Sequence, residues 1–345
     1  MRFYYLTLTL FLQTLILFSL QVDAAKLSFG QIALIQNQGV SGIQTVFEES
    51  MIEIQDLPSV EAFASEVIKS QLSNPRDAES ISEYASEALL ALAELSISKN
   101  IKSSYVIEYS SAGISKGLVI AYLNKGLDIN EAIEAAAKGS VFGAILFSAE
   151  TKTNINENVS AAASGSLAGI IEITKSNGID ITQSVQACAS GIIYGTINSA
   201  IENNSAIYES LASACEGVAE AAIEASVREE LDLTQQITNA TLGAGRSAVK
   251  TATSLSLEID PTLRAIHVGL KRGTFDSIPG KGNNIRIMIA PQKNLDGYVL
   301  VNSIEKGLFE GSAQADYFPD QFDALPIIET PFEYDPVVRQ VSPFN

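Results

Sequence analysis

The chain has 345 residues, of which 46% are hydrophobic and 18% charged, so it can bury a sizeable core rather than remain disordered. Its formal net charge of −18 excludes the cationic surface that a nucleic-acid-binding protein needs, and it disfavours docking on anionic lipid. A single histidine and the absence of tryptophan argue against histidine-rich metal sites and multi-histidine catalysis.

The N-terminus has the pattern of an export signal. Arg2 precedes a long apolar run over 3–20, and the small-residue sequence Val-Asp-Ala at 22–24 provides a cleavage site. An uncleaved membrane anchor is the alternative, since about 18 apolar residues just reach spanning length. We expect a signal peptide over 1–24, and a mature protein that is secreted or located in the periplasm or cell envelope.

The central part of the chain is an internal repeat with a period of 26 residues. Each unit carries a glycine, and a second small residue follows it four positions later. The glycines of this pattern are Gly113, Gly117, Gly139, Gly143, Gly165, Gly169, Gly191, Gly195, Gly217 and Gly243. Weaker copies on both sides, the last marked by Gly269 and Gly273, extend the predicted repeats over 83–273. Residues 25–82 are then expected to be an N-terminal capping helical region.

Each unit also carries the start signal of a helix. Asp128, Asn154, Asp180 and Asp232 occur at one phase of the repeat, each followed three positions later by Glu or Gln, as in a capping box. Apolar residues with helical spacing follow, which predicts one helix of about 20 residues per unit, or ~30 Å. The remaining linker is too short to return over that length, so successive helices are expected to be antiparallel neighbours.

A bend at the first glycine is the alternative, and it would give two short helices per unit in a two-layered solenoid. A glycine inside a helix costs about 1 kcal/mol relative to alanine, so its repeated use needs a reason, either close backbone approach or a bend. In both cases the sequence predicts an all-α repeat array resembling an α-solenoid.

Small residues four positions apart lie on one helix face and allow another backbone to come close. In membranes this pattern marks helix association, but the same helices carry Lys138, Glu172 and Glu220, which are costly in hydrocarbon. We therefore expect tight packing between repeat units in water, and membrane insertion is disfavoured. A membrane-active or pore-forming protein is the alternative.

One motif is similar to a catalytic one. Gly113, Ser115 and Gly117 match the G-x-S-x-G pattern of hydrolases, although both glycines belong to the repeat and the local pattern is helical rather than strand–turn–helix. The single candidate base, His267, lies in a different unit and is expected to be a partly buried helix residue. No cofactor or phosphate-binding motif occurs, so we predict neither catalytic nor cofactor-binding residues, with a hydrolase as a remote alternative.

The two cysteines, Cys188 and Cys215, lie 27 positions apart, near the middle of adjacent predicted helices. An oxidising compartment would favour a disulfide between them. Small apolar fillers at an alanine-rich contact are the other interpretation, and the sequence leaves both open.

The composition changes after residue 273. Apolar runs over 284–290 and 298–304, separated by turn residues, predict a short β-hairpin region over 274–315. Residues 316–345 are rich in proline and aromatic residues and predict an extended tail. Asp316, Asp320 and Asp323 could hold a divalent cation there, or they could form a solvated acidic loop.

The function expected from these features is an exported, non-enzymatic structural or protein-interaction scaffold with an acidic surface. Repetition supports it, because an array replicates a surface whereas an active site needs one unique set of residues. The expected partner is a cationic protein surface, a divalent cation or another copy of the chain.

Overall fold

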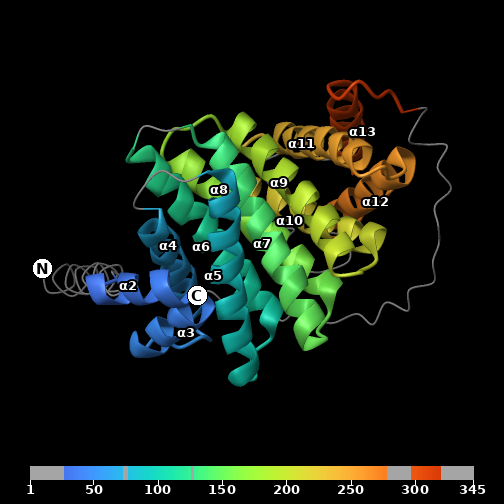
Figure 1. Ribbon diagram of the computed structural model, residues 1–345. Coiled ribbons are helices and arrows are strands. Elements are labelled where there is room, and N and C mark those ends of the chain that lie inside the picture. The colour runs from blue at the N-terminus through green and yellow to red at the C-terminus, as the bar shows by residue number, and fades with distance from the viewer. Residues whose placement is uncertain (1–26, 73–76, 126–127, 278–296, 320–345) are drawn as a thin grey trace, which may run out of the picture.

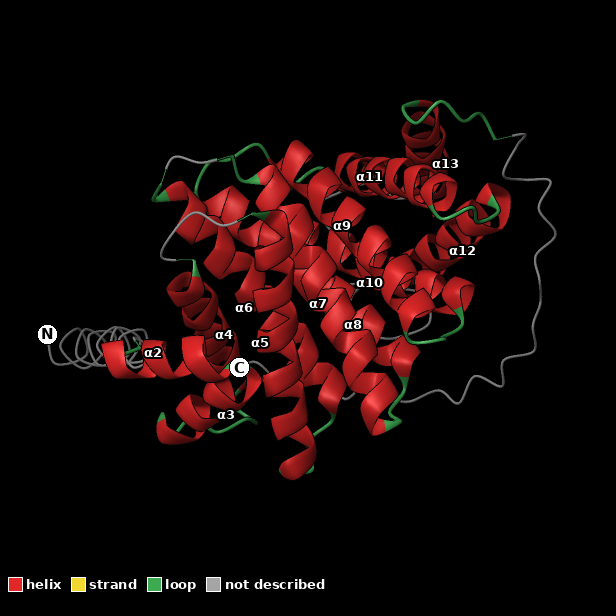
Figure 2. Cartoon of the chain, in the orientation of Figure 1, coloured by secondary structure: helices red, strands yellow, loops and turns green. Residues whose placement is uncertain are grey.

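The structure is a computed structural model, and it describes residues 27–72, 77–125, 128–277 and 297–319. These residues form twelve helices and no strand (Figure 2). The helices are α2 (Phe29–Gln38), α3 (Val40–Glu49), α4 (Leu57–Gln71), α5 (Ala78–Ser98), α6 (Ser103–Leu123), α7 (Asn130–Thr151), α8 (Ile155–Ser176), α9 (Ile181–Glu202), α10 (Ile207–Arg228), α11 (Leu233–Ser254), α12 (Ile259–Ser277) and α13 (Gly297–Ala313).

Each central repeat unit forms one unbroken helix, because the helices from α7 to α11 each have 22 residues and run through their glycines. The side chains of Asn154, Asp180 and Asp232 accept hydrogen bonds from first-turn N–H groups, as the capping pattern predicts. The prediction of one helix of about 20 residues per unit is therefore correct, and the bend at the first glycine does not occur.

The helices end with a residue in the left-handed region, and these residues also follow the 26-residue period. They are Lys152, Gly178, Asn204, Glu230 and Ser256, with φ between 52° and 66°. After each of them, the next N–H donates to a carbonyl five positions earlier, for example from Ile179 to Thr174 at 2.9 Å. This is the Schellman arrangement, which satisfies the free carbonyls at the end of a helix.

The helices pack in two layers in which each helix lies against the helix two positions along the chain (Figure 1). One layer contains α4, α6, α8, α10 and α12, and the other contains α5, α7, α9, α11 and α13. Gly165 and Gly169 of α8 meet Glu108 and Ala112 of α6 in the same order, so helices within a layer are parallel. Loops of three or four residues join successive helices from α7 to α12, so these run in opposite directions.

The repeat glycines make this close packing possible. A Cβ atom added at any of the ten would lie 1.9–2.9 Å from a carbonyl oxygen of the helix two before it, nearer than real Cβ atoms approach other atoms. The closest case is Gly165, 1.9 Å from the carbonyl oxygen of Glu108. Side chains join the same helices, because the Ser164 hydroxyl donates to Glu108 and the Ser190 hydroxyl donates to Glu134 at 2.9 Å.

The C-terminal part differs from the sequence prediction. The run over 298–304 was expected to be a strand of a β-hairpin, but it belongs to α13, so this prediction is wrong. The other expected strand, 284–290, lies outside the described residues, as do the predicted signal peptide over 1–24 and the predicted tail from residue 320 onward. In α13, Gly307 and Gly311 pack on α11, where a Cβ at Gly311 would lie 2.3 Å from the carbonyl oxygen of Leu242. This contact makes α13 a further copy of the repeat helix.

The core between the layers is built mainly from Ala, Ile, Val and Leu side chains. At the N-terminal end, α2 and α3 pack on α4 and α5, and the rings of Phe47 and Phe63 meet edge to face at 5.1 Å. Among the described helices, α7 alone is long and apolar enough to cross a membrane, and 72% of its most apolar window is buried inside the protein. A core helix has the same properties, so this single helix is weak evidence for a membrane span.

Candidate functional site

The repeat glycines lie in helix–helix contacts, where the close approach of two backbones accounts for them. The Ser115 side chain is also buried, at 0% exposure, inside the unbroken helix α6. The described residues directly before it, from 77 to 114, form α5 and the first half of α6 without a strand, so the strand–turn–helix geometry of a hydrolase nucleophile is not formed there. His267 lies in α12, is 6% exposed, and has its Nε2 atom 3.6 Å from Oε1 of Glu305.

The two cysteines lie in consecutive helices, Cys188 in α9 and Cys215 in α10. Both are free thiols and fully buried, which corresponds to the second of the two interpretations that the sequence left open. Burial raises the pKa of both thiols far above the ordinary value, because the thiolate would lose its hydration.

Two described helices, α5 and α10, carry four carboxylates each, and the row on α10 is the one that reaches a pocket. Glu209, Glu216, Glu220 and Glu224 form this acidic stripe, which is half-buried to exposed along its length. Spacings of seven, four and four residues place them on one face of the helix. From the sequence, Glu220 counted only as a charge that is costly in a membrane, although the spacing of the last three carboxylates indicated a row along the helix.

Beside this stripe, alternating charges connect four parallel helices of one layer. Glu61 of α4, Lys116 of α6, Glu172 of α8 and Arg228 of α10 form this charge ladder. The Lys116 ammonium lies 2.6 Å from Glu61 and 2.9 Å from Glu172, and Arg228 lies 3.3 Å from Glu172. Burial alone would lower the pKa of Lys116, but the carboxylates of Glu61 and Glu172 raise it above its ordinary value.

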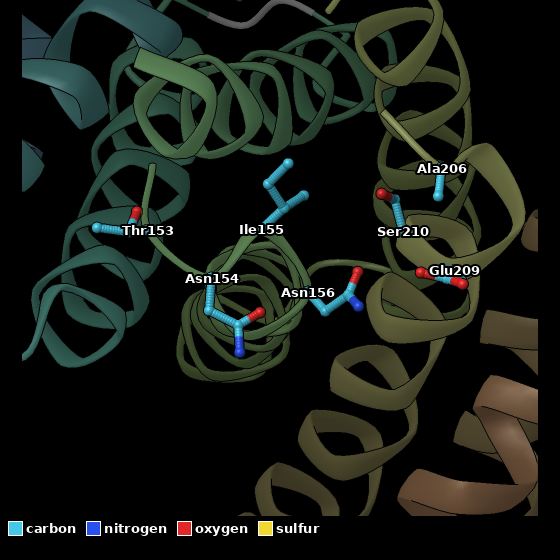
Figure 3. Close-up of a pocket in the computed structure, with 7 residues that line it drawn as sticks. All are labelled: Thr153, Asn154, Ile155, Asn156, Ala206, Glu209 and Ser210. Carbon is cyan, nitrogen blue, oxygen red and sulfur yellow. The ribbon is translucent and has the colours of Figure 1, made fainter. Parts of the chain in front are cut away.

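A shallow pocket of about 240 Å³ lies where α8 and α10 begin. Its walls come from Thr153, Asn154, Ile155 and Asn156 on one side and from Ala206, Glu209 and Ser210 on the other (Figure 3). Dedicated small-molecule sites usually exceed this size, at about 300–1,000 Å³.

The chemistry of the pocket is polar and weakly acidic. Glu209 is the only charged residue of the lining, and it is also the first member of the acidic stripe. The N-cap of α10 is Ala206, which makes no side-chain capping bond, whereas the neighbouring helix α8 is capped by Asn154. The pocket can accept hydrogen bonds from a cationic or hydroxyl-bearing side chain, and it brings no nucleophile–base pair together.

Within the described residues, no group of three His, Cys, Asp or Glu side chains is arranged to hold a metal ion. Of the three aspartates predicted as a cation site, only Asp316 is described, and Asp320 and Asp323 lie outside the described residues. The cation site therefore stays a prediction.

No known protein family matches the chain, and no curated protein is significantly similar to it. The function must therefore be argued from the geometry of the array.

Proposed function

We propose that the protein is an exported, non-enzymatic scaffold whose helical array binds a basic surface of a partner protein along α10. The acidic stripe is the observation that carries this proposal, because four carboxylates line one helix face and the first of them reaches the pocket at the start of α10. Glu216, Glu220 and Glu224 already take part in interactions within the chain, so long Lys or Arg side chains of a partner would compete for these three carboxylates. One of them could enter the pocket beside Glu209.

The packing of the glycines supports a scaffold over a membrane-active protein. A glycine face used for insertion would have to leave its present contact, since each repeat glycine faces a backbone carbonyl of another helix. Vesicles filled with a fluorescent dye test this alternative, and we expect no leakage when the full mature chain is added. Leakage would favour the pore-forming alternative instead.

The test of the scaffold uses a decapeptide rich in Lys and Arg as a defined cationic probe. Replacing Glu220 and Glu224 by Gln removes two carboxylates of the stripe. At roughly 0.5 kcal/mol per surface ion pair, the affinity should fall about fivefold in isothermal titration calorimetry.

The matched control is the replacement of Glu48 and Glu49 by Gln, because these exposed residues of α3 are adjacent in sequence, belong to no row of carboxylates along a helix face and have the same effect on net charge. We expect the control variant to bind the probe with nearly unchanged affinity. An equal loss in both variants would mean that net charge alone attracts the peptide, and the stripe would not be a binding surface.

A further inference from the structure

The last described helices expose apolar side chains at positions that earlier helices bury. One position of the repeat is occupied by an Ile or Val that is at most 3% exposed, namely Val119, Ile145, Ile171, Ile197, Ile223 and Val249. The next residue in this phase is Phe275 of α12, which is 54% exposed. In α13, Phe309 is 47% exposed, whereas Val141, Leu167 and Ile193, which likewise lie two residues after a repeat glycine, are fully buried. We call Phe275 and Phe309 the terminal face.

This exposure follows from the way in which each helix packs on the helix two positions along the chain. Each inner helix of a layer is covered by the helix two positions further on, and within the described residues no helix follows α13. Solenoids generally need a terminal cap with a polar outer surface, because an open end leaves core positions in water. The terminal face therefore requires a cover.

The chain that leaves α13 turns back over the two terminal helices. The Tyr317 hydroxyl donates a hydrogen bond to Oδ1 of Asp260 at the start of α12. The Phe318 ring lies against Phe309 of the terminal face, with 6.3 Å between ring centroids. Residues 317 and 318 thus contact both terminal helices directly before the undescribed segment 320–345 begins.

Charge distinguishes the two segments that could supply the cover. Helices α2 to α10 carry nineteen Asp or Glu against five Lys or Arg, whereas α11 to α13 carry six Lys or Arg against four Asp or Glu. Segment 320–345 has five acidic residues and one Arg, so its charge is opposite to that of α11–α13. Segment 278–296 has three basic residues and one Asp, so its charge has the same sign as α11–α13.

We propose that segment 320–345 of the same chain caps the array by lying on the terminal face. Its four aromatic residues, among them Phe332 and Tyr334, supply apolar cover for the exposed phenylalanines. Its carboxylates pair with Lys and Arg side chains of α12 and α13, of which Arg272 and Lys306 are exposed. The cap is independent of partner binding on α10, so either proposal can fail without the other.

Photocrosslinking in the full mature chain tests the cap. Phe309 is replaced by p-benzoylphenylalanine, which keeps an aromatic group at a position that is already 47% exposed. The control carries the same photoreactive residue in place of Tyr105, which is 39% exposed at the start of α6. Mass spectrometry should identify cross-links within one chain from position 309 to 320–345, and none to that segment from position 105.

Three results would overturn the proposal: cross-links from position 309 to 278–296, cross-links to a second copy, or no cross-link at all. A charge reversal then tests the ion pairs. Arg272→Glu with Lys306→Glu should lower the cross-link yield severalfold, whereas Lys99→Glu with Lys175→Glu should not. An unchanged yield in the first variant, with its helical circular dichroism intact, would contradict the charge complementarity behind the proposal.

Discussion

Replacing Gly165 by alanine tests the packing rule of the array most directly. The added Cβ would lie 1.9 Å from the carbonyl oxygen of Glu108, 2.7 Å from its carbonyl carbon and 3.0 Å from its Cα. These are backbone atoms of α6 and cannot rotate away, so α6 and α8 must separate along their contact. Overpacking usually costs about 1–3 kcal/mol, and a backbone clash of this depth belongs at the upper end. Alanine stabilises a helix by about 1 kcal/mol relative to glycine, so the free energy of unfolding should fall by a net amount of about 2 kcal/mol.

Two other glycines make the result interpretable. Gly143 meets its nearest carbonyl oxygen at 2.9 Å, and Gly30 of α2 has no neighbour within 4 Å. Urea unfolding followed by circular dichroism should show the largest loss for Gly165→Ala, a smaller change for Gly143→Ala, and a gain of up to about 1 kcal/mol for Gly30→Ala. If Gly165→Ala were as stable as Gly30→Ala, the two helices would not be in the close contact described above.

Three further predictions concern charge, thiols and helix ends. Lys116→Met leaves the two glutamates of the charge ladder facing each other and should lower the unfolding free energy by about 1–2 kcal/mol. The pKa of Lys116 is raised in the folded protein, so its ion pairs should stabilise the fold at pH values below the ordinary lysine pKa. This stabilisation should be lost as the pH rises through the pKa of Lys116 in the folded protein, which melting temperatures measured against pH can show. Cys188 and Cys215 should be inert to Ellman's reagent in the folded protein and both react after unfolding, whereas a disulfide would release no thiol. Ser256 and Gly178 both have positive φ, a backbone conformation that favours glycine. Ser256→Gly should therefore raise the melting temperature and the free energy of unfolding, the latter by about 0.5–1 kcal/mol, and Gly178→Ala should lower both by a similar amount. Effects of the same sign and size in the two variants would contradict this reasoning.

The helices could be predicted from the sequence because their signals are local. Asn154, Asp180 and Asp232 mark helix starts through hydrogen bonds to the first turn, and the 26-residue period sets the helix length. The left-handed helix ends were predictable at Gly178 and at Asn204, because glycine and asparagine favour this region. At Glu230 and Ser256 the side chain gives no signal for positive φ, and tertiary packing holds the backbone there.

The partner of each glycine face could not be predicted from its spacing. Two small residues four positions apart show that a backbone comes close, but they do not show which helix provides it. Helices adjacent in sequence are antiparallel and belong to different layers, whereas the glycines join parallel helices two units apart. The candidate site has the same limit, because the acidic stripe is visible in one helix while the charge ladder needs Glu61, Lys116, Glu172 and Arg228 from four helices.

The last helix shows how a shift of phase conceals a repeat. Gly307 follows Gly269 by 38 positions, which is 12 more than the period, so a search at fixed spacing does not reach it. The run over 298–304 is rich in Val and Ile, and β-branched residues favour strands when no tertiary partner is considered. However, Gly307 and Gly311 pack closely against the backbone of α11, as the earlier glycine pairs pack against the helix two before them. Packing on the preceding helix of the layer therefore decides the conformation of this segment, and the pair of glycines four positions apart was the signal that a strand assignment overlooked.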